Sequence, residues 1–174
     1  MNRILLSAAL LLLLSACFES HTPLGPPGEI ARGSSFIGTW RCHTSTMESN
    51  EIMTLTVLPF DEQQLLLELK ESSVIGDVEQ PSASDIDRYR FYPSQLASKS
   101  GPQILWNAQE LGQTTWQFVR IKQADKSNLV AQIVQDDALL GKTEPEKLGE
   151  LRKRVGDEAI YGEAIRCKRV VDVK

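Results

Sequence analysis

Apolar and polar residues alternate with a period of two along most of this chain, and that pattern most limits its fold. Such alternation places apolar side chains on one face of a β-strand and polar ones on the other. It predicts strands over 36–44, 52–58, 65–70, 88–92, 103–109, 115–123, 129–135 and 160–171. Because these strands are closely spaced, we expect a mainly β fold, a single antiparallel barrel or sandwich of about eight strands.

One segment before the last strand has helical spacing instead. Thr143-Glu144-Pro145-Glu146 has the pattern of a capping box with proline in the first turn. Leu148, Leu151 and Val155 then recur every three or four residues, which predicts a single helix. The basic triplet 152–154 is better explained by the helix dipole than by a phosphate or lipid headgroup. Residues 71–87 are polar, and we expect an exposed loop there.

The first seventeen residues are typical of an export signal. A basic start is followed by the apolar run 4–14, which at ~1.5 Å per residue reaches about half of a ~30 Å hydrocarbon core. This favours a signal peptide over residues 1–16, not a transmembrane span. Leu14-Ser15-Ala16-Cys17 then resembles the lipobox of bacterial lipoproteins. The resemblance implies cleavage after Ala16 and attachment of diacylglycerol and palmitate to Cys17.

The residue after that cysteine bears on localisation. In such lipoproteins an aspartate there commonly signals retention in the inner membrane, and this chain has Phe18. The resemblance therefore implies an outer-membrane lipoprotein of the bacterial cell envelope, facing the periplasm. Residues 17–35 are rich in proline and glycine and have no apolar periodicity, which predicts a lipidated cysteine followed by a flexible tether. Residues 36–174 are then one β-rich globular domain.

Composition and charge exclude other classes of protein. The chain of 174 residues is 41% hydrophobic and 24% charged, as ordinary globular proteins are. A net charge of −4 provides no basic field for nucleic acid. Two cysteines remain beside Cys17, namely Cys42 in the first strand and Cys167 in the last. In an oxidising compartment they are expected to form a disulfide that joins the two ends of the domain; two buried thiols are the alternative.

Gly38-Thr39-Trp40, near the start of the domain, resembles the Gly-x-Trp motif of lipocalin-like barrels. The resemblance implies that Trp40 packs at the floor of a barrel, against a basic residue from near the end of the chain. Arg166 and Arg169 are the candidates for that residue. A tryptophan in an ordinary strand core is the alternative.

Catalytic and metal-binding motifs are missing from the sequence. His43 is the one histidine of the domain, and no carboxylate or cysteine stands at a ligand spacing from it. The acidic pairs Asp136-Asp137 and Asp157-Glu158 are adjacent residues, which a strand would direct to opposite faces. We therefore expect a protein that is not an enzyme and has no metal and no cofactor.

Two functions lead, and an enzyme of unrecognised type is a third alternative. The first is a non-catalytic interaction module, anchored in the outer membrane, that binds another envelope protein. The second is a lipocalin-like carrier of a small hydrophobic or lipid-like ligand. Aromatic side chains usually build cores, but in the second reading they would line the ligand site. The candidates are Trp40, Trp106, Trp116 and Phe118.

Overall fold

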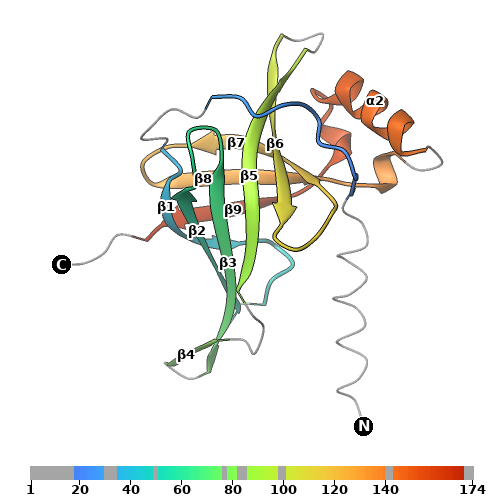
Figure 1. Cartoon of the computed structure of the whole chain (residues 1–174). Coiled ribbons are helices and arrows are strands. Elements are labelled where there is room, and N and C mark those ends of the chain that lie inside the picture. Colours follow the sequence, from blue (N-terminus) through green and yellow to red (C-terminus); the bar gives the residue numbers. More distant parts are fainter. Residues whose placement is uncertain are drawn as a thin grey trace.

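The computed structural model describes residues 18–29, 35–48, 51–75, 78–81, 86–97, 101–139 and 143–170 (Figure 1). Its strands are β1 (Gly38–His43), β2 (Glu51–Pro59), β3 (Leu65–Ile75), β4 (Val78–Pro81), β5 (Asp87–Leu96), β6 (Gln103–Glu110), β7 (Gln117–Ala124), β8 (Asn128–Val134) and β9 (Tyr161–Arg169). Its helical segments are η1 (Asp137–Leu139), α2 (Glu144–Arg154) and η2 (Glu158–Ile160).

Strand pairing closes into a ring, so the fold is a barrel and not a sandwich. The order is β2-β1-β9-β8-β7-β6-β5-β3, and β2 pairs in turn with β3. Every pairing is antiparallel. The ninth strand, β4, pairs only with β3, outside the ring. The predicted mainly β fold with a helix before the last strand is thus confirmed, and the barrel is the correct one of the two architectures.

The interior of the barrel follows from the period-two pattern. In β3, the odd-numbered positions Leu65, Leu67 and Leu69 face the interior, and β2 places apolar residues opposite two of them. Leu55 pairs with Leu69, and Val57 pairs with Leu67. The interior core includes Leu65 and Val57, which are 1% and 2% exposed.

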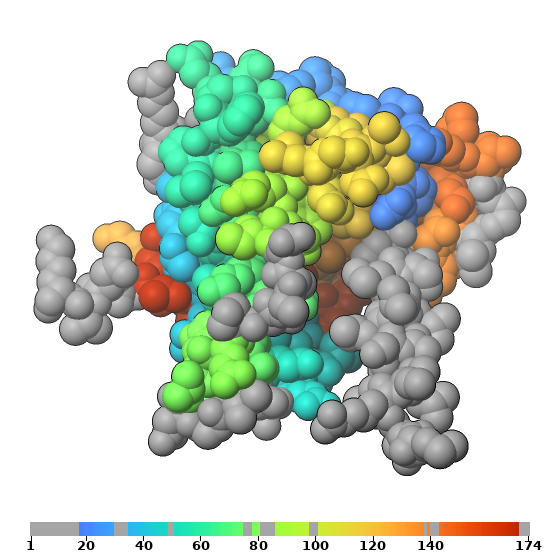
Figure 2. Space-filling view, turned by 60° about the horizontal axis from the view of Figure 1, so that its bottom comes forward, coloured from blue at the N-terminus to red at the C-terminus, as the bar shows by residue number. Residues whose placement is uncertain are grey.

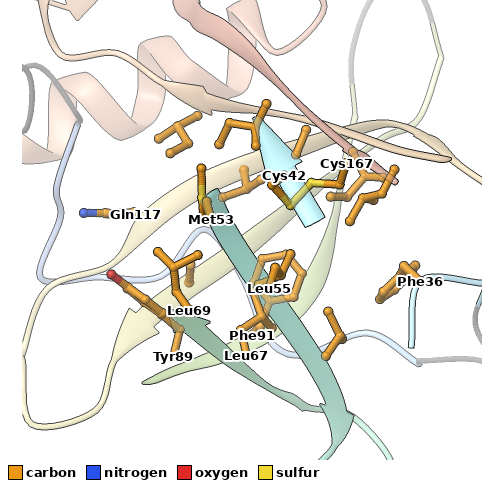
Figure 3. A pocket seen from close by; sticks show the side chains of 18 residues that line it. Phe36, Cys42, Met53, Leu55, Leu67, Leu69, Tyr89, Phe91, Gln117 and Cys167 are labelled. Carbon is orange, nitrogen blue, oxygen red and sulfur yellow. A yellow bond between two sulfur atoms is a disulfide. The ribbon is translucent and has the colours of Figure 1, made fainter. Parts of the chain in front are cut away.

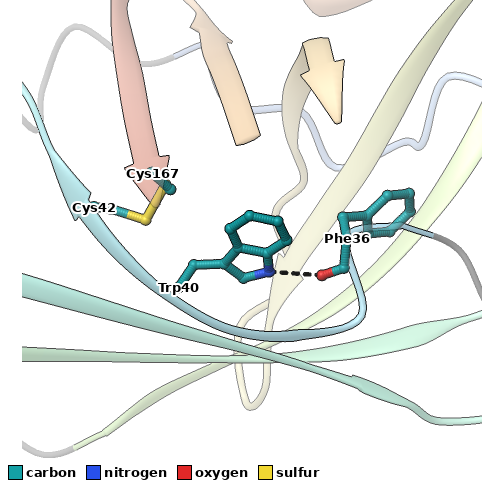
Figure 4. The surroundings of a disulfide bond; sticks show 4 residues. All are labelled: Phe36, Trp40, Cys42 and Cys167. Atoms are coloured by element: carbon teal, nitrogen blue, oxygen red, sulfur yellow. Dashed lines mark hydrogen bonds between the residues drawn. A yellow bond between two sulfur atoms is a disulfide. The ribbon is translucent and has the colours of Figure 1, made fainter. Parts of the chain in front are cut away.

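The first and last strands are joined as predicted. Cys42 of β1 lies opposite Cys167 of β9 in the strand register, and the two form a disulfide (Figure 4). On the same face of β1, the indole N–H of Trp40 donates to the backbone oxygen of Phe36 at 2.7 Å. The guanidinium of Arg169 lies 4.4 Å from the centre of the Trp40 ring. Arg169, not Arg166, therefore occupies the position that the lipocalin-like motif implied.

The loop predicted over 71–87 is wrong in part. β3 continues to Ile75, and β4 pairs back on it, with Ser73 opposite Gln80. This ribbon extends beyond the barrel, as Figure 1 shows, and β4 is largely exposed. Because such a ribbon has no continuous buried face, its sequence lacks the apolar alternation that marks the barrel strands.

A second core lies outside the barrel, beneath α2. Thr143 is the N-cap of this helix, and its N–H donates to the Glu146 carboxylate at 2.8 Å, as the capping-box pattern predicted. The helix and the segment 18–29 cover the outer faces of β5, β6, β7 and β8. The buried residues of this outer core are Phe18, Leu24, Tyr92, Leu96, Leu105, Trp116, Phe118, Val134, Leu139, Leu148, Leu151, Val155, Ile160 and Tyr161.

The prediction of a flexible tether is wrong for residues 18–29, here called the N-terminal strap. In Figure 2 the strap (blue) lies between the yellow β6 region and the orange α2. Phe18 and Leu24 are 1% and 3% exposed. The N–H of Phe18 donates to the Val134 oxygen at 3.0 Å, and Ser20 forms a β-bridge with Trp116. Residues 30–34 of the predicted tether, Cys17 and the signal peptide, including Ala16, lie outside the described residues.

Buried backbone groups of the strap are paired with the barrel. Asn107 is fully buried, and its side-chain oxygen accepts from the N–H of Leu24 at 2.8 Å. Its amide nitrogen donates to Ser94 Oγ at 2.9 Å. From α2, Arg152 donates to the Leu24 oxygen at 3.0 Å. Since unpaired buried amides are costly, this pairing explains how an irregular segment can be part of a core.

Candidate functional site

The barrel encloses a cavity of about 160 Å³, and its walls are almost entirely apolar. Figure 3 shows the side chains around it. They come from the inward faces of the ring strands and from Phe36. The described lining residues are Phe36, Cys42, Met53, Leu55, Val57, Leu67, Leu69, Tyr89, Phe91, Ala108, Gln117, Val119, Ile121, Leu129, Ala131, Ile133, Ile165 and Cys167.

Small side chains help to leave this space open. An eight-stranded barrel is just wide enough for side chains to fill its interior or to hold one small ligand. Here β6 and β8 contribute Ala108 and Ala131 to the wall, where larger residues would occupy the volume. The Cys42–Cys167 disulfide also faces the cavity and fixes the spacing of β1 and β9 beside it (Figure 3).

Phe36 lies at one end of the cavity (Figure 3), and it belongs to a cluster of aromatic rings around Trp106. Phe91 stacks on Trp106, with ring centres 4.6 Å apart and an angle of 14° between the planes. Phe36 meets the same tryptophan edge-on, with ring centres 4.9 Å apart. Trp40 is fully buried in the same interior core.

The other end of the cavity adjoins a polar hollow of about 280 Å³, here called the vestibule. Tyr89, Ala108 and Gln117 line both spaces. In Figure 3 the hydroxyl of Tyr89 and the amide of Gln117 lie at the end of the cavity remote from Phe36. The vestibule is completed by Glu19, Glu110, Gln113 and Thr115.

The N-terminal strap contributes one wall of the vestibule. Gln117 Nε2 donates to Glu19 Oε1 at 3.3 Å. On either side of Glu19 the backbone is held, because Phe18 donates to Val134 and Ser20 exchanges two hydrogen bonds with Trp116 at 3.0 and 2.7 Å. The strap therefore carries a carboxylate to the mouth of the barrel.

None of the four aromatic residues predicted to line a ligand site is among the described lining residues. Trp106 lies behind Phe91, and Trp40 packs under Arg169. Gln117 and Val119 of β7 face inward, so Phe118 faces outward, and it packs with Trp116 in the outer core. These four side chains therefore do not line this cavity, because large aromatic residues occur in the outer core as well as in the interior core.

The acidic pairs of the sequence have structural partners. Asp157 accepts from the N–H of Ala159 at 2.9 Å, and this hydrogen bond lowers the pKa of the Asp157 carboxyl. Arg120 lies 2.6 Å from the Glu158 carboxylate and lowers its pKa. Asp136 forms an ion pair with Lys147 at 2.5 Å. Asp136, Asp157 and Glu158 therefore each have a structural partner within the folded domain.

The described part of the chain does not bring the other candidate catalytic or metal-binding residues together. His43 is exposed on β1, on the face opposite Cys42. No group of three or more histidine, cysteine, aspartate or glutamate side chains among the described residues could hold a metal ion.

No family model matches this chain, and neither a curated protein nor a solved structure is significantly similar to it. No enzyme family is therefore identified. Of the helices described, none is both long and apolar enough to cross a membrane.

Proposed function

We propose that this protein binds a small apolar molecule inside its barrel and carries it in the cell envelope. The observation that supports this best is the apolar cavity of about 160 Å³ inside the ring of strands. An engineered cavity of about 150 Å³ with similar walls stays dry and binds benzene, so this volume suits a single ring or a short alkyl chain.

The size of the cavity also limits the affinity. Burial of each methylene group contributes about 0.8 kcal/mol, so a six-carbon chain gains roughly 5 kcal/mol before the cost of association. A gross gain of that size corresponds to binding no tighter than about 0.1–1 mM. Tighter binding requires contacts outside the cavity.

The proposal includes the lipid anchor and the outer-membrane location that the lipobox resemblance implies. Cys17 precedes Phe18, which is seated on β8 through the Val134 oxygen. A lipid on Cys17 would then be attached one residue from the folded domain, without an intervening leash. Such an anchor would keep the carrier close to the bilayer, where apolar ligands are concentrated.

The interaction module is the weaker proposal. It would use exposed apolar side chains, of which Phe60, Val78 and Ile104 are 63%, 61% and 55% exposed. These residues lie on separate elements: the turn after β2, β4 and β6. Exposed apolar residues that are scattered singly are normal on protein surfaces and do not indicate a partner.

Calorimetric titration with toluene tests the carrier proposal, with the chain from Phe18 onward, which retains every described residue. We expect saturable binding with a negative heat-capacity change. Ala131→Leu should abolish it by filling the cavity, whereas Ala159→Leu, the same change at an exposed position, should leave it intact. Retention of toluene binding by a folded Ala131→Leu protein would contradict the proposal.

A further inference from the structure

We infer that the ligand is an amphiphile whose polar head is cationic or uncharged, not anionic, with its head in the vestibule and its tail in the apolar cavity. This inference rests on the proposed carrier function and adds the class of ligand. Three observations support it: the two hollows adjoin, the vestibule is negatively charged, and the backbone on both sides of Glu19 is held by hydrogen bonds.

The two hollows adjoin at one end of the barrel. Three side chains, those of Tyr89, Ala108 and Gln117, line both of them. The vestibule has a volume of about 280 Å³ and the cavity one of about 160 Å³. A molecule with its chain in the cavity would therefore place a head group among the vestibule side chains.

The vestibule carries negative charge and hydrogen-bond acceptors. Glu19 and Glu110 line it, and no lysine, arginine or histidine is among its described lining residues. Glu110 forms no ion pair with any described residue. A carboxylate or phosphate head would face two carboxylates without a compensating cation, whereas an ammonium group would be attracted to both.

Nearby cations are engaged elsewhere. On β5, which contributes Tyr89 to the vestibule, Arg88 pairs with Glu68 at 2.8 Å. Arg90 donates to Gln109 at 2.5 Å and lies 5.6 Å from the centre of the Trp116 ring. Both contacts are made on the outer surface of the barrel, so neither guanidinium offsets the charge of the vestibule.

The position of Glu19 is fixed by the hydrogen bonds of its neighbours in the strap. The hydrogen bonds of Phe18 and Ser20 fix the backbone on both sides, and the amide of Gln117 donates to the carboxylate at 3.3 Å. A preorganised carboxylate loses little freedom when a head group binds. This gives the packing of the strap a functional role at the mouth of the barrel.

The test compares three probes with the same chain: hexylamine, hexanol and hexanoate. Each is titrated at neutral pH and low ionic strength into the chain from Phe18 onward, by calorimetry. Partly exposed ion pairs contribute modestly, so we expect hexylamine to bind roughly three- to tenfold more tightly than hexanol. Hexanoate should bind more weakly than hexanol. About 1 M salt should shrink both differences, because its screening length is only ~3 Å.

Substitutions identify the groups responsible. Glu19→Gln and Glu110→Gln should each lower the ratio of the hexylamine affinity to the hexanol affinity, because each removes one negative charge from the vestibule. Glu62→Gln, at an exposed position in the turn between β2 and β3, removes the same charge away from both hollows and should have no effect.

The outcomes separate this inference from the proposed function. If none of the three probes binds, the carrier function and the inference both fail. If hexanol binds but hexanoate binds as tightly as hexylamine, the inference is overturned and the apolar site stands. If the preference for hexylamine persists in Glu19→Gln/Glu110→Gln, the vestibule is not its source and the inference is likewise wrong.

Discussion

Leu24→Ala tests whether the N-terminal strap is part of the folded domain. The side chain of Leu24 is 3% exposed and belongs to the outer core beneath α2. Its two hydrogen bonds, to Asn107 and Arg152, use backbone atoms. The substitution therefore leaves the hydrogen bonds in place and removes only the packing of the side chain.

The magnitude follows from that packing. Leucine-to-alanine changes at buried sites cost 2–5 kcal/mol, from lost transfer energy and the cavity left behind. We expect about 3 kcal/mol here. For a domain of this size, 1 kcal/mol shifts Tm by roughly 2–4 °C, so the variant should melt about 6–12 °C lower.

Urea unfolding followed by circular dichroism measures the change in the free energy of unfolding. The matched control is Leu111→Ala, in the turn after β6, where the side chain is 50% exposed. We expect the control to lie within about 0.5 kcal/mol of the unsubstituted protein. If Leu24→Ala is as mild as the control, the strap is not part of the core, and the reasoning about the vestibule loses Glu19.

Three further outcomes follow from the structure. Replacing both Cys42 and Cys167 by serine should destabilise the domain by about 4–5 kcal/mol in the chain-entropy model, for a sequence separation of 125, as urea unfolding would show. The hydrogen bond from the Ser20 hydroxyl lowers the pKa of the Glu144 carboxyl, so this hydrogen bond stabilises the strap at pH values above the usual glutamate pKa. The stabilisation is lost as the pH falls below that value and the carboxyl is protonated. Limited proteolysis of the strap should therefore accelerate in acid, and it should accelerate less in Glu144→Gln. Cys17→Ala should abolish metabolic labelling with palmitate, and persistent labelling would contradict the lipobox prediction.

The ring of strands could be predicted from the sequence because its β2–β3 side has one buried face. Leu65, Leu67 and Leu69 occupy alternate positions and all face the interior, as the period-two rule assumes. The disulfide could be predicted because only two cysteines were left in the domain. The position of the helix could be predicted because its cap and its apolar spacing agree.

The residues that line the cavity could not be predicted from the sequence, for a physical reason. On β6 the residues Leu105 to Gln109 are buried without interruption, since one face lines the barrel and the other is covered by the outer core. Alternation between apolar and polar residues does not show which face is the interior when both are buried. Trp116 and Phe118, which the sequence predicts to line a ligand site, instead belong to the outer core.

The packing of the strap could not be predicted because its sequence has no periodic pattern of apolar residues. Its two large apolar side chains, Phe18 and Leu24, are separated by a polar stretch, and its backbone is paired at individual points instead of along a ladder. Proline and glycine predicted flexibility, yet Gly28 donates to the Pro93 oxygen at 2.8 Å. A partner surface that is formed only by the folded barrel leaves no local signal in the sequence.

A methyl NMR spectrum recorded during a titration with hexanol tests the central proposal most directly. Leu55, Leu69 and Ile121 line the cavity, whereas Leu148 and Leu151 lie in the outer core. We predict saturable shifts of the first three methyl signals at a common apparent Kd, with the last two unchanged. Saturable shifts confined to Leu148 and Leu151, or no saturable shift at any of the five, would contradict a ligand site inside the barrel.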